Sequence, residues 1–252
     1  MTGLEPGVLA ALVLLGLAAG VGITAVGPGG VLVTAGLFAL TGLPPAHVAG
    51  TAMVTNVATG VLGTAVYTRS GQLREPGTRR TAALLCGGAV AGTPLGVWLN
   101  GLVTGRVFGV LLGVLVALAA VLVLCRRGEG AGSPGPGWPV VLGAGAAVAA
   151  AGALFGVGGP MLCVPLLVAL GSPVLAALAA AQAQSVVIAG AGTLGYVAAG
   201  AVDWPLAALV GVPELAGVVA GWAIARAVPA GALKGALVVS LLALAPYVAL
   251  HG

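Results

Sequence analysis

Charged residues are scarce in this sequence. Asp, Glu, Lys and Arg make up 6% of its 252 residues, whereas an ordinary soluble domain carries about 25%. So few charges cannot cover a water-facing surface, which excludes a soluble globular protein. Hydrophobic residues make up 60% of the chain, and apolar runs long enough to cross a hydrocarbon layer of roughly 30 Å recur along its length. The sequence therefore predicts an all-α polytopic membrane protein.

Residue patterns that mark enzymes, metal centres and nucleic-acid binding are missing too. The cysteines at 86, 125 and 163 stand singly without CxxC spacing, so we expect inert thiols and no metal or redox site. No basic stretch is interleaved with aromatic residues, and neither HExxH nor GxSxG occurs. We therefore expect no enzyme activity, no catalytic residue, no cofactor and no nucleic-acid partner.

An internal duplication is present in the chain. Sliding the sequence against itself gives a register at an offset of 129 residues, with no gap from Gly27 to Pro76. The matches are mostly Gly, Pro, Tyr and Thr, which have specific backbone or polar roles, so chance apolar similarity does not explain them. We predict membrane repeats at 1–125 and 138–252, joined by a solvated linker at 126–137 that is rich in Gly, Pro and charge. The matched pairs include Gly27/Gly156, Gly29/Gly158, Gly30/Gly159, Gly42/Gly171, Pro44/Pro173, Gly63/Gly192, Tyr67/Tyr196, Gly71/Gly200 and Pro76/Pro205.

Hydropathy divides each half into four or five transmembrane segments. The second segment of each half, at about 14 residues, is short for a full span and is expected to be broken or re-entrant. The apolar segments are 7–26, 29–42, 46–68, 80–100 and 104–125, then 138–155, 158–171, 174–199, 204–224 and 230–250.

The short segments decide how the two halves are related. If they cross the membrane, five segments per half make the repeats inverted; if they turn back, four per half make them parallel. In the inverted scheme Arg106 alone of the assigned Arg and Lys residues lies outside, whereas the parallel scheme moves Arg226 and Lys234 outside too. The positive-inside rule therefore favours inverted repeats.

Glycine clusters interrupt both halves at the same place. Residues 20–30 read GVGITAVGPGG and residues 152–159 read GALFGVGG. A broken helix exposes peptide groups in a low-dielectric medium, and transporters use the free N–H groups of such a helix start to face an anion. We expect Gly29, Gly30, Gly158 and Gly159 to bind substrate. The alternative is that these glycines only allow close helix packing.

These residues resemble a known family. The stretch GVGGPMLCVP, the following segment that begins with small residues and carries polar ones, and the loop GAVDW together are similar to the sulfite exporter TauE/SafE family. The resemblance covers nearly the whole chain and implies a membrane carrier of small anions, often sulfur-containing. The first half departs from the pattern, with Pro28 where a glycine is common and Gly36 where the second half has Pro165.

Polar side chains gather in the third segment of each half. At the offset of 129, Thr55 matches Gln184 and Asn56 matches Ser185. Neutral amides and hydroxyls suit an oxyanion that must be desolvated without being trapped by a full countercharge, and interhelical hydrogen bonding is the alternative role. Thr51, Thr59 and Gln182 lie in the same segments.

Glu214 is the acidic residue placed well inside a span. An intramembrane carboxylate near an anion path is a candidate for coupling transport to protons, and a neutral hydrogen-bonded role beside Pro213 is the alternative.

Together these features predict a secondary transporter that moves a small inorganic or organic anion, such as sulfite or a sulfonate, through a midplane site between the repeats. We expect a multi-pass protein of the cytoplasmic (inner) membrane, with the bilayer as partner, protons as candidate coupling ion and a homo-oligomer as candidate assembly. The alternative is an accessory membrane subunit that docks a partner through its glycine-rich faces.

Overall fold

A computed structural model describes residues 4–25, 27–125, 137–227, 239 and 242. Over these residues the chain is all-helical, and six helices are long and apolar enough to cross a membrane. The predicted all-α polytopic architecture is thereby confirmed. The elements are α1 (Pro6–Ala25), η1 (Pro28–Gly30), α2 (Val31–Thr41), α3 (Pro45–Arg69), η2 (Gln72–Arg74), α4 (Pro76–Asn100), α5 (Gly105–Cys125), α6 (Trp138–Phe155), α7 (Pro160–Ala169), α8 (Val174–Ala198) and α9 (Trp204–Ala227).

Most helix boundaries lie within two or three residues of the hydropathy prediction. The exception is α4, which begins at Pro76 rather than at residue 80. Proline suits a first helical position because the missing N–H has no helical acceptor there, and the Thr78 hydroxyl donates to the Glu75 carboxylate in the same turn. The predicted linker, apart from Gly137, and the predicted last segment, apart from Val239 and Leu242, lie outside the described residues.

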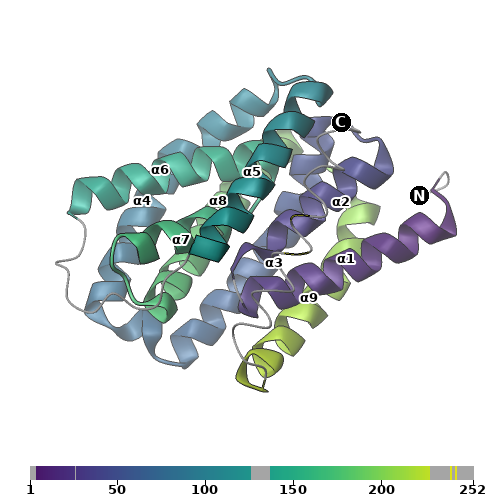
Figure 1. Ribbon diagram of the computed structural model, residues 1–252. Helices are drawn as coiled ribbons and strands as arrows, with labels where there is room; N and C mark the ends of the chain where they lie inside the picture. The colour runs from purple at the N-terminus through teal and green to yellow at the C-terminus, as the bar shows by residue number, and fades with distance from the viewer. Residues whose placement is uncertain (1–3, 26, 126–136, 228–238, 240–241, 243–252) are drawn as a thin grey trace.

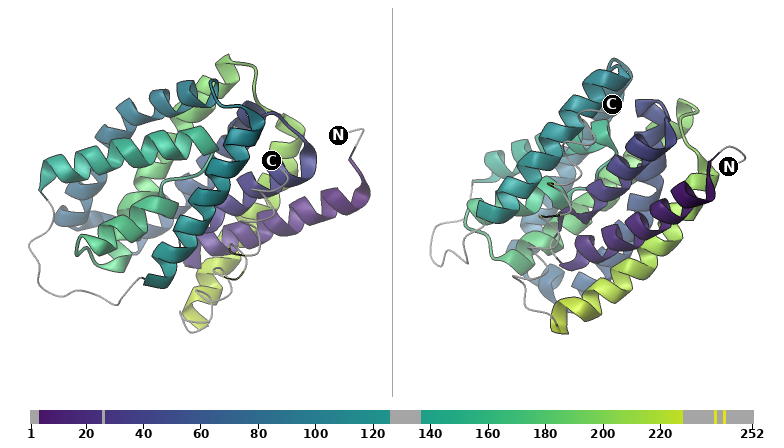
Figure 2. Two further views of the ribbon diagram at one scale, coloured as in Figure 1. Left: turned by 45° about the horizontal axis from the view of Figure 1, so that its top comes forward. Right: turned by 45° about the vertical axis from the view of Figure 1, so that its right-hand side comes forward.

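Two pairs of helices pack side by side through small residues. On one side of the molecule α1 lies along α9, and on the other α4 lies along α6 (Figures 1 and 2). Gly88 and Gly92 bring the α4 backbone against α6 at Ala146, and Gly217 brings α9 against α1 at Leu17. Close backbone approach through small residues is a common basis of helix association in membranes.

The contacts also fix the directions of the helices. Gly16 and Gly20 of α1 lie against Val210 and Glu214 of α9, so these helices run the same way. Helices α4 and α6 are also parallel, because the residues of α6 that contact α4 advance along the chain from Gly88 to Gly96.

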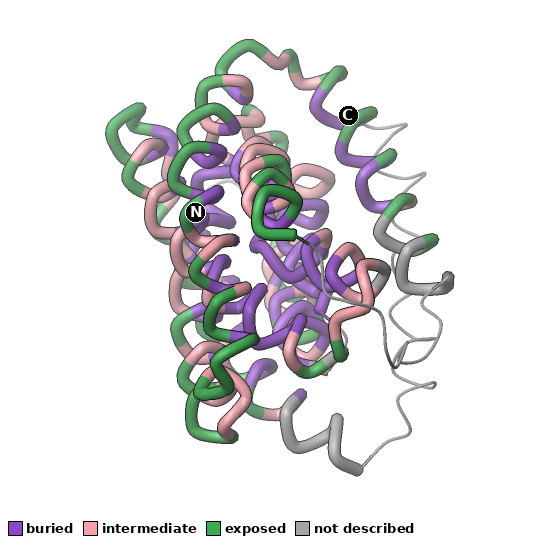
Figure 3. Tube along the Cα trace, turned by 90° about the vertical axis from the view of Figure 1, so that its left-hand side faces the viewer, coloured by how far each residue is buried: buried purple, intermediate pink, exposed green. Residues whose placement is uncertain are grey.

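At the centre, α3 and α8 run in opposite directions. Gly50, near the start of α3, packs against Tyr196 near the end of α8, whereas Gly63 packs against Gln182. Buried residues gather inside the bundle, and exposed residues lie on its outside (Figure 3). The exposed side chains include large apolar ones such as Leu14, Val90 and Val212, which suit contact with lipid.

Both short helices follow a break in the chain. After α1 the chain turns at Gly27, and α2 runs back along α1, so that Gly36 lies against Leu15 and Leu12. After α6 the chain turns at Gly156 and α7 begins at Pro160. Gly27 and Gly156 have φ angles of 112° and 73°, in the left-handed region that favours glycine. The two breaks lie next to each other, since the Thr34 hydroxyl of α2 donates to the Gly156 carbonyl at 3.2 Å.

Candidate substrate site between the two helix breaks

The two breaks enclose a small polar cavity with α3 and α8. Its volume is about 10 Å³, room for about one water molecule. Asn56 and Ser185 each lie halfway along their 25-residue helix, so the cavity lies level with the middle of α3 and α8. The lining residues are Ile23, Gly27, Gly30, Asn56, Thr59, Val157, Gly158, Pro160, Met161, Gln182 and Ser185.

Asn56 connects α3 to the second break. Its Nδ2 donates to the Gly156 carbonyl at 2.9 Å, the same oxygen that accepts from Thr34. A Cβ on Gly30 or on Gly158 would lie 3.2 or 3.3 Å from Asn56 Oδ1. This oxygen therefore lies between the two breaks, and the absence of side chains at both glycines gives it access to the cavity.

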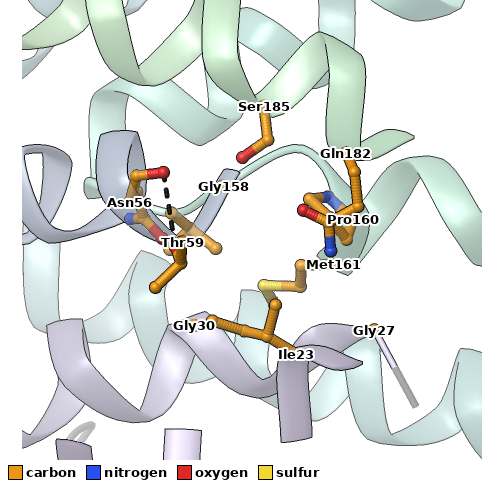
Figure 4. A pocket seen from close by; sticks show the side chains of 11 residues that line it. Ile23, Gly27, Gly30, Asn56, Thr59, Gly158, Pro160, Met161, Gln182 and Ser185 are labelled. Atoms are coloured by element: carbon orange, nitrogen blue, oxygen red, sulfur yellow. Dashed lines mark hydrogen bonds between the residues drawn. The ribbon is translucent and has the colours of Figure 1, made fainter. Parts of the chain in front are cut away.

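Gln182 supplies the opposite wall. In Figure 4 Asn56 and Thr59 of α3 lie across one central space from Gln182 and Met161, with Ser185 to one side. The Gln182 side chain is 1% exposed, and its Nε2 has no hydrogen-bond partner among the described residues. A buried, unpartnered amide donor costs about 1–3 kcal/mol, so a ligand or water that accepts from it would be stabilised.

Backbone amides add further donors on the same side. Within the described part of the chain, the N–H groups of Gly158 and Gly159 make no hydrogen bond. Both precede the first turn of α7, where the positive end of the helix dipole favours negative charge. No Lys, Arg, Asp, Glu or His is among the lining residues. The cavity is therefore neutral, with donors from amides and a hydroxyl.

Comparison with known proteins supplies the family. The family model described as sulfite exporter TauE/SafE matches residues 12–248, nearly the whole chain. This chain belongs to the sulfite exporter TauE/SafE family. No curated protein and no solved structure matches it. The family is one of membrane transporters, so this member is a multi-pass membrane protein whose substrate is a small anion, and it is not an enzyme.

Four predicted site residues of this TauE/SafE member line the cavity: Gly30, Asn56, Gly158 and Ser185. The other two predicted glycines pack against neighbouring backbone. Gly29 lies against α1 at Ala19 and Ile23, and a Cβ on Gly159 would lie 3.0 Å from the Ala181 carbonyl of α8.

The remaining two predicted residues are not among those that line the cavity. The Thr55 hydroxyl donates to the Ala52 carbonyl at 3.0 Å, and its methyl group faces Gly211 of α9. Gln184 donates through Nε2 to the Gly145 carbonyl of α6 at 2.9 Å. The prediction did not select Gln182 and Thr59, although both were visible as polar residues of the same segments.

Glu214 lies in α9, outside the cavity. It is fully buried, and within the described part of the chain neither carboxyl oxygen has a hydrogen-bond partner. The Thr55 side chain lies beside the carboxyl, but its hydroxyl donates to Ala52. On the other side the α9 backbone at Glu214 touches Gly20 of α1, a helix whose sequence has no titratable residue.

A larger hollow of about 230 Å³ lies where α4 and α8 begin, and Thr78 and Ser172 contribute to its lining. The charged residue among those lining it is Glu75. A carboxylate repels an anion, so this hollow does not suit the substrate of a TauE/SafE protein.

Proposed function

We propose that this protein is a secondary transporter that moves a small sulfur-containing anion across the cytoplasmic membrane through the cavity between the two breaks. The observation that carries the proposal is the meeting of two interrupted helices at an internal cavity with an unpartnered Gln182 donor. Irregular backbone inside a membrane is tolerated where it is buried in protein or lines a cavity, and transporters place their substrate sites at such breaks.

The proposed ligands are Gly30, Asn56, Gly158 and Ser185, joined by Gln182. The predicted residues Gly29, Gly159, Thr55 and Gln184 would support the cavity from outside, although the free amide of Gly159 lies close enough to the break to act on a ligand as well. Neutral donors stabilise an anion without holding it as tightly as a full positive charge would. A carrier must release its substrate on the far side, so moderate binding favours turnover.

We propose further that the two halves are inverted repeats. The positive-φ glycines of the described residues form three pairs at the offset of 129: 27/156, 42/171 and 71/200. The pairing of α1 with α9 corresponds to that of α6 with α4. Helix α1 is parallel to α9, and α9 is antiparallel to α8 because a short turn joins them. Helix α8 is in turn antiparallel to α3, so α1 and α3 run in the same direction.

The same reasoning places α4 and α6 opposite to α3. Corresponding helices of the two halves therefore run in opposite senses, as inverted repeats require. Such halves provide two arrangements of similar energy around one fixed site, and rocking one bundle against the other would open the cavity to each side in turn.

Glu214 is the proposed coupling group. Among the described residues the carboxyl has no hydrogen-bond partner to hold it in one protonation state. Thr55 of α3 faces Glu214, and the titratable residues of α3 lie toward its ends: His47, Tyr67 and Arg69. A carboxyl group in this place can bind a proton on one side of the transport cycle and lose it on the other.

The test is transport by the purified protein in proteoliposomes, with sulfite, sulfate, thiosulfate and methanesulfonate compared, with and without a pH gradient. We expect saturable flux of at least one anion, and faster flux with a proton gradient of one direction. The absence of flux for every anion would contradict the proposal and favour the accessory-subunit function instead.

A further inference from the structure

The cavity offers an acceptor as well as donors. The Gly156 oxygen is a carbonyl and can only accept, so the group of Asn56 that faces it at 2.9 Å is the amide nitrogen. The side-chain oxygen of Asn56 must then point the other way, toward Gly30 and Gly158. Within the described residues no group donates a hydrogen bond to it. Thr59 does not donate to this oxygen, because its hydroxyl donates to the backbone carbonyls of Thr55 and Asn56.

The donors lie on the other side of the same space. Gln182 Nε2 is buried and unpartnered, and the Ser185 hydroxyl makes no hydrogen bond in the described structure and lies beside Gly158. One water molecule can accept from Gln182 and donate to Asn56 at the same time, so an anion that replaces this water must offer a donor as well as acceptors.

We propose that this site selects an oxyanion that carries a proton of its own, hydrogen sulfite rather than the sulfite dianion. The proposal rests on the proposed function. A sulfite dianion has lone pairs only, and these would face the Asn56 oxygen without a hydrogen between them. Among the described residues no cationic side chain lines the cavity to offset that repulsion. The free energy of desolvating an ion also rises steeply with its charge. The S–OH or S–H form of hydrogen sulfite supplies oxygen acceptors and carries one charge.

The test uses exchange flux in proteoliposomes with the same pH inside and outside, so that no proton gradient contributes. Labelled sulfite and labelled methanesulfonate, a monoanion with no dissociable proton across this range, are compared from slightly acidic to slightly alkaline pH. Above the second pKa of sulfurous acid, the KM for total sulfite should rise about tenfold per pH unit, because the hydrogen-bearing form falls by that factor. At acidic pH the KM for methanesulfonate should be higher than that for sulfite, and it should not change with pH.

Three outcomes would overturn the inference. A sulfite KM that stays constant or falls with pH would identify the dianion as the ligand. Parallel shifts for both anions would assign the pH dependence to the protein, with Glu214 as the group to examine. Preference for methanesulfonate at acidic pH would show that a donor on the ligand is not needed. Absence of flux for both anions would also overturn the inference, and absence of flux for sulfate and thiosulfate as well would overturn the proposed function.

A variant tests the acceptor directly. Asn56→Ala removes Oδ1 and should raise the KM for sulfite at acidic pH about tenfold, the value of one hydrogen bond, without raising that for methanesulfonate. Thr93→Val is the matched control, because Thr93 is also a buried polar residue with an unpartnered hydroxyl but lies on α4 outside the cavity. Equal effects of Asn56→Ala on both anions would contradict the assigned role of Asn56. The pH profile of the unsubstituted protein decides the proposal if the variant does not fold.

Discussion

At the scale of single residues, the buried Gln182 side chain lowers the stability of the fold. Its amide nitrogen is buried and has no hydrogen-bond partner among the described residues, and its side-chain oxygen lies against Gly63 of α3. The residue at the corresponding place in the first half is Met53, which packs against Gly192 in the matching way. A methionine side chain therefore fits this contact between α3 and α8.

We predict that Gln182→Met raises stability and lowers transport. Removing a buried donor without a partner should stabilise the fold by about 1 kcal/mol, and the loss of the donor should remove most anion flux. Thermal unfolding in detergent and flux in proteoliposomes measure the two effects. The control is Gln184→Met, which removes a hydrogen bond to Gly145 that is already made and should therefore lower stability. A Gln182→Met protein with unchanged flux would exclude Gln182 as a ligand.

A second prediction concerns Glu214. Glu214→Gln keeps the shape of the side chain and removes its titration, so the protein should fold and insert. Because the proposed role is coupling rather than substrate binding, anion exchange at equal pH should persist, whereas the acceleration by a pH gradient should be lost. Flux driven by a pH gradient and exchange flux are measured on the same vesicles. A variant that still responds to the gradient would rule out Glu214 as the coupling group.

The sequence shows which segments carry polar residues but not which way these residues face. Successive helical residues point about 100° apart, so Thr55 and Asn56 cannot both face one small cavity. Helix packing decides which of them faces the cavity. Thr55 packs against α9, and Asn56 bonds to the second break. Thr55 and Gln184, which match at the offset of 129, were both predicted as substrate ligands, and neither is among the residues that line the cavity.

At the scale of elements, the two breaks share a backbone conformation but differ in their surroundings. Gly27 and Gly156 both have positive φ. A Cβ on Gly156 would lie 2.6 Å from the Ala49 backbone of α3, whereas a Cβ on Gly27 would meet Leu178 and Pro160 at an ordinary 3.6 Å.

We therefore predict that Gly156→Ala destabilises the protein more than Gly27→Ala. Both substitutions cost roughly 1–2 kcal/mol for a left-handed alanine, and Gly156→Ala adds about 1–3 kcal/mol for the collision with backbone that cannot move away. Midpoints of thermal unfolding in detergent provide the comparison, with Gly143→Ala, an exposed position with open space, as control. Equal losses at Gly27 and Gly156 would contradict the packing described for the second break.

Element boundaries were predictable because Gly and Pro mark them. The range predicted for α6, 138–155, agrees with the structure, and the Gly/Pro clusters coincide with both breaks. The start of α4 was misplaced because Arg79 and Arg80 lower the hydropathy of its first turns. A helix can extend beyond the hydrocarbon layer, and there proline and capping determine where it begins.

At the scale of the whole molecule, the proposed inverted arrangement would place equivalent helix ends on opposite sides of the membrane. Ser70 and Ala199 are exposed residues that follow α3 and α8, and they match at the offset of 129. Arg69, Arg74 and Arg79 lie close to Ser70 in the sequence, so the positive-inside rule places that end in the cytoplasm.

We predict that Ser70→Cys and Ala199→Cys, each in a background without the three native cysteines, are labelled from opposite sides by a membrane-impermeant maleimide. The maleimide should label Ala199→Cys in intact cells and Ser70→Cys in inside-out vesicles. Labelling of both from the same side would exclude inverted repeats. Hydropathy alone left both schemes open, because the short helices α2 and α7 could cross or turn back; the direction of α2 along α1 and of α3 against α8 favours crossing.

The central claim is that the anion passes through the cavity between the two breaks. A Cβ on Gly158 would lie 2.7 Å from Ser185 Oγ, so Gly158→Val fills this space, whereas a Cβ on Gly190, in α8, would meet no atom within 4 Å. The most direct measurement is sulfite flux in proteoliposomes of Gly158→Val and Gly190→Val at equal protein content. The account predicts flux at the level of protein-free vesicles for Gly158→Val and nearly full flux for Gly190→Val. Undiminished flux through folded Gly158→Val protein would contradict it.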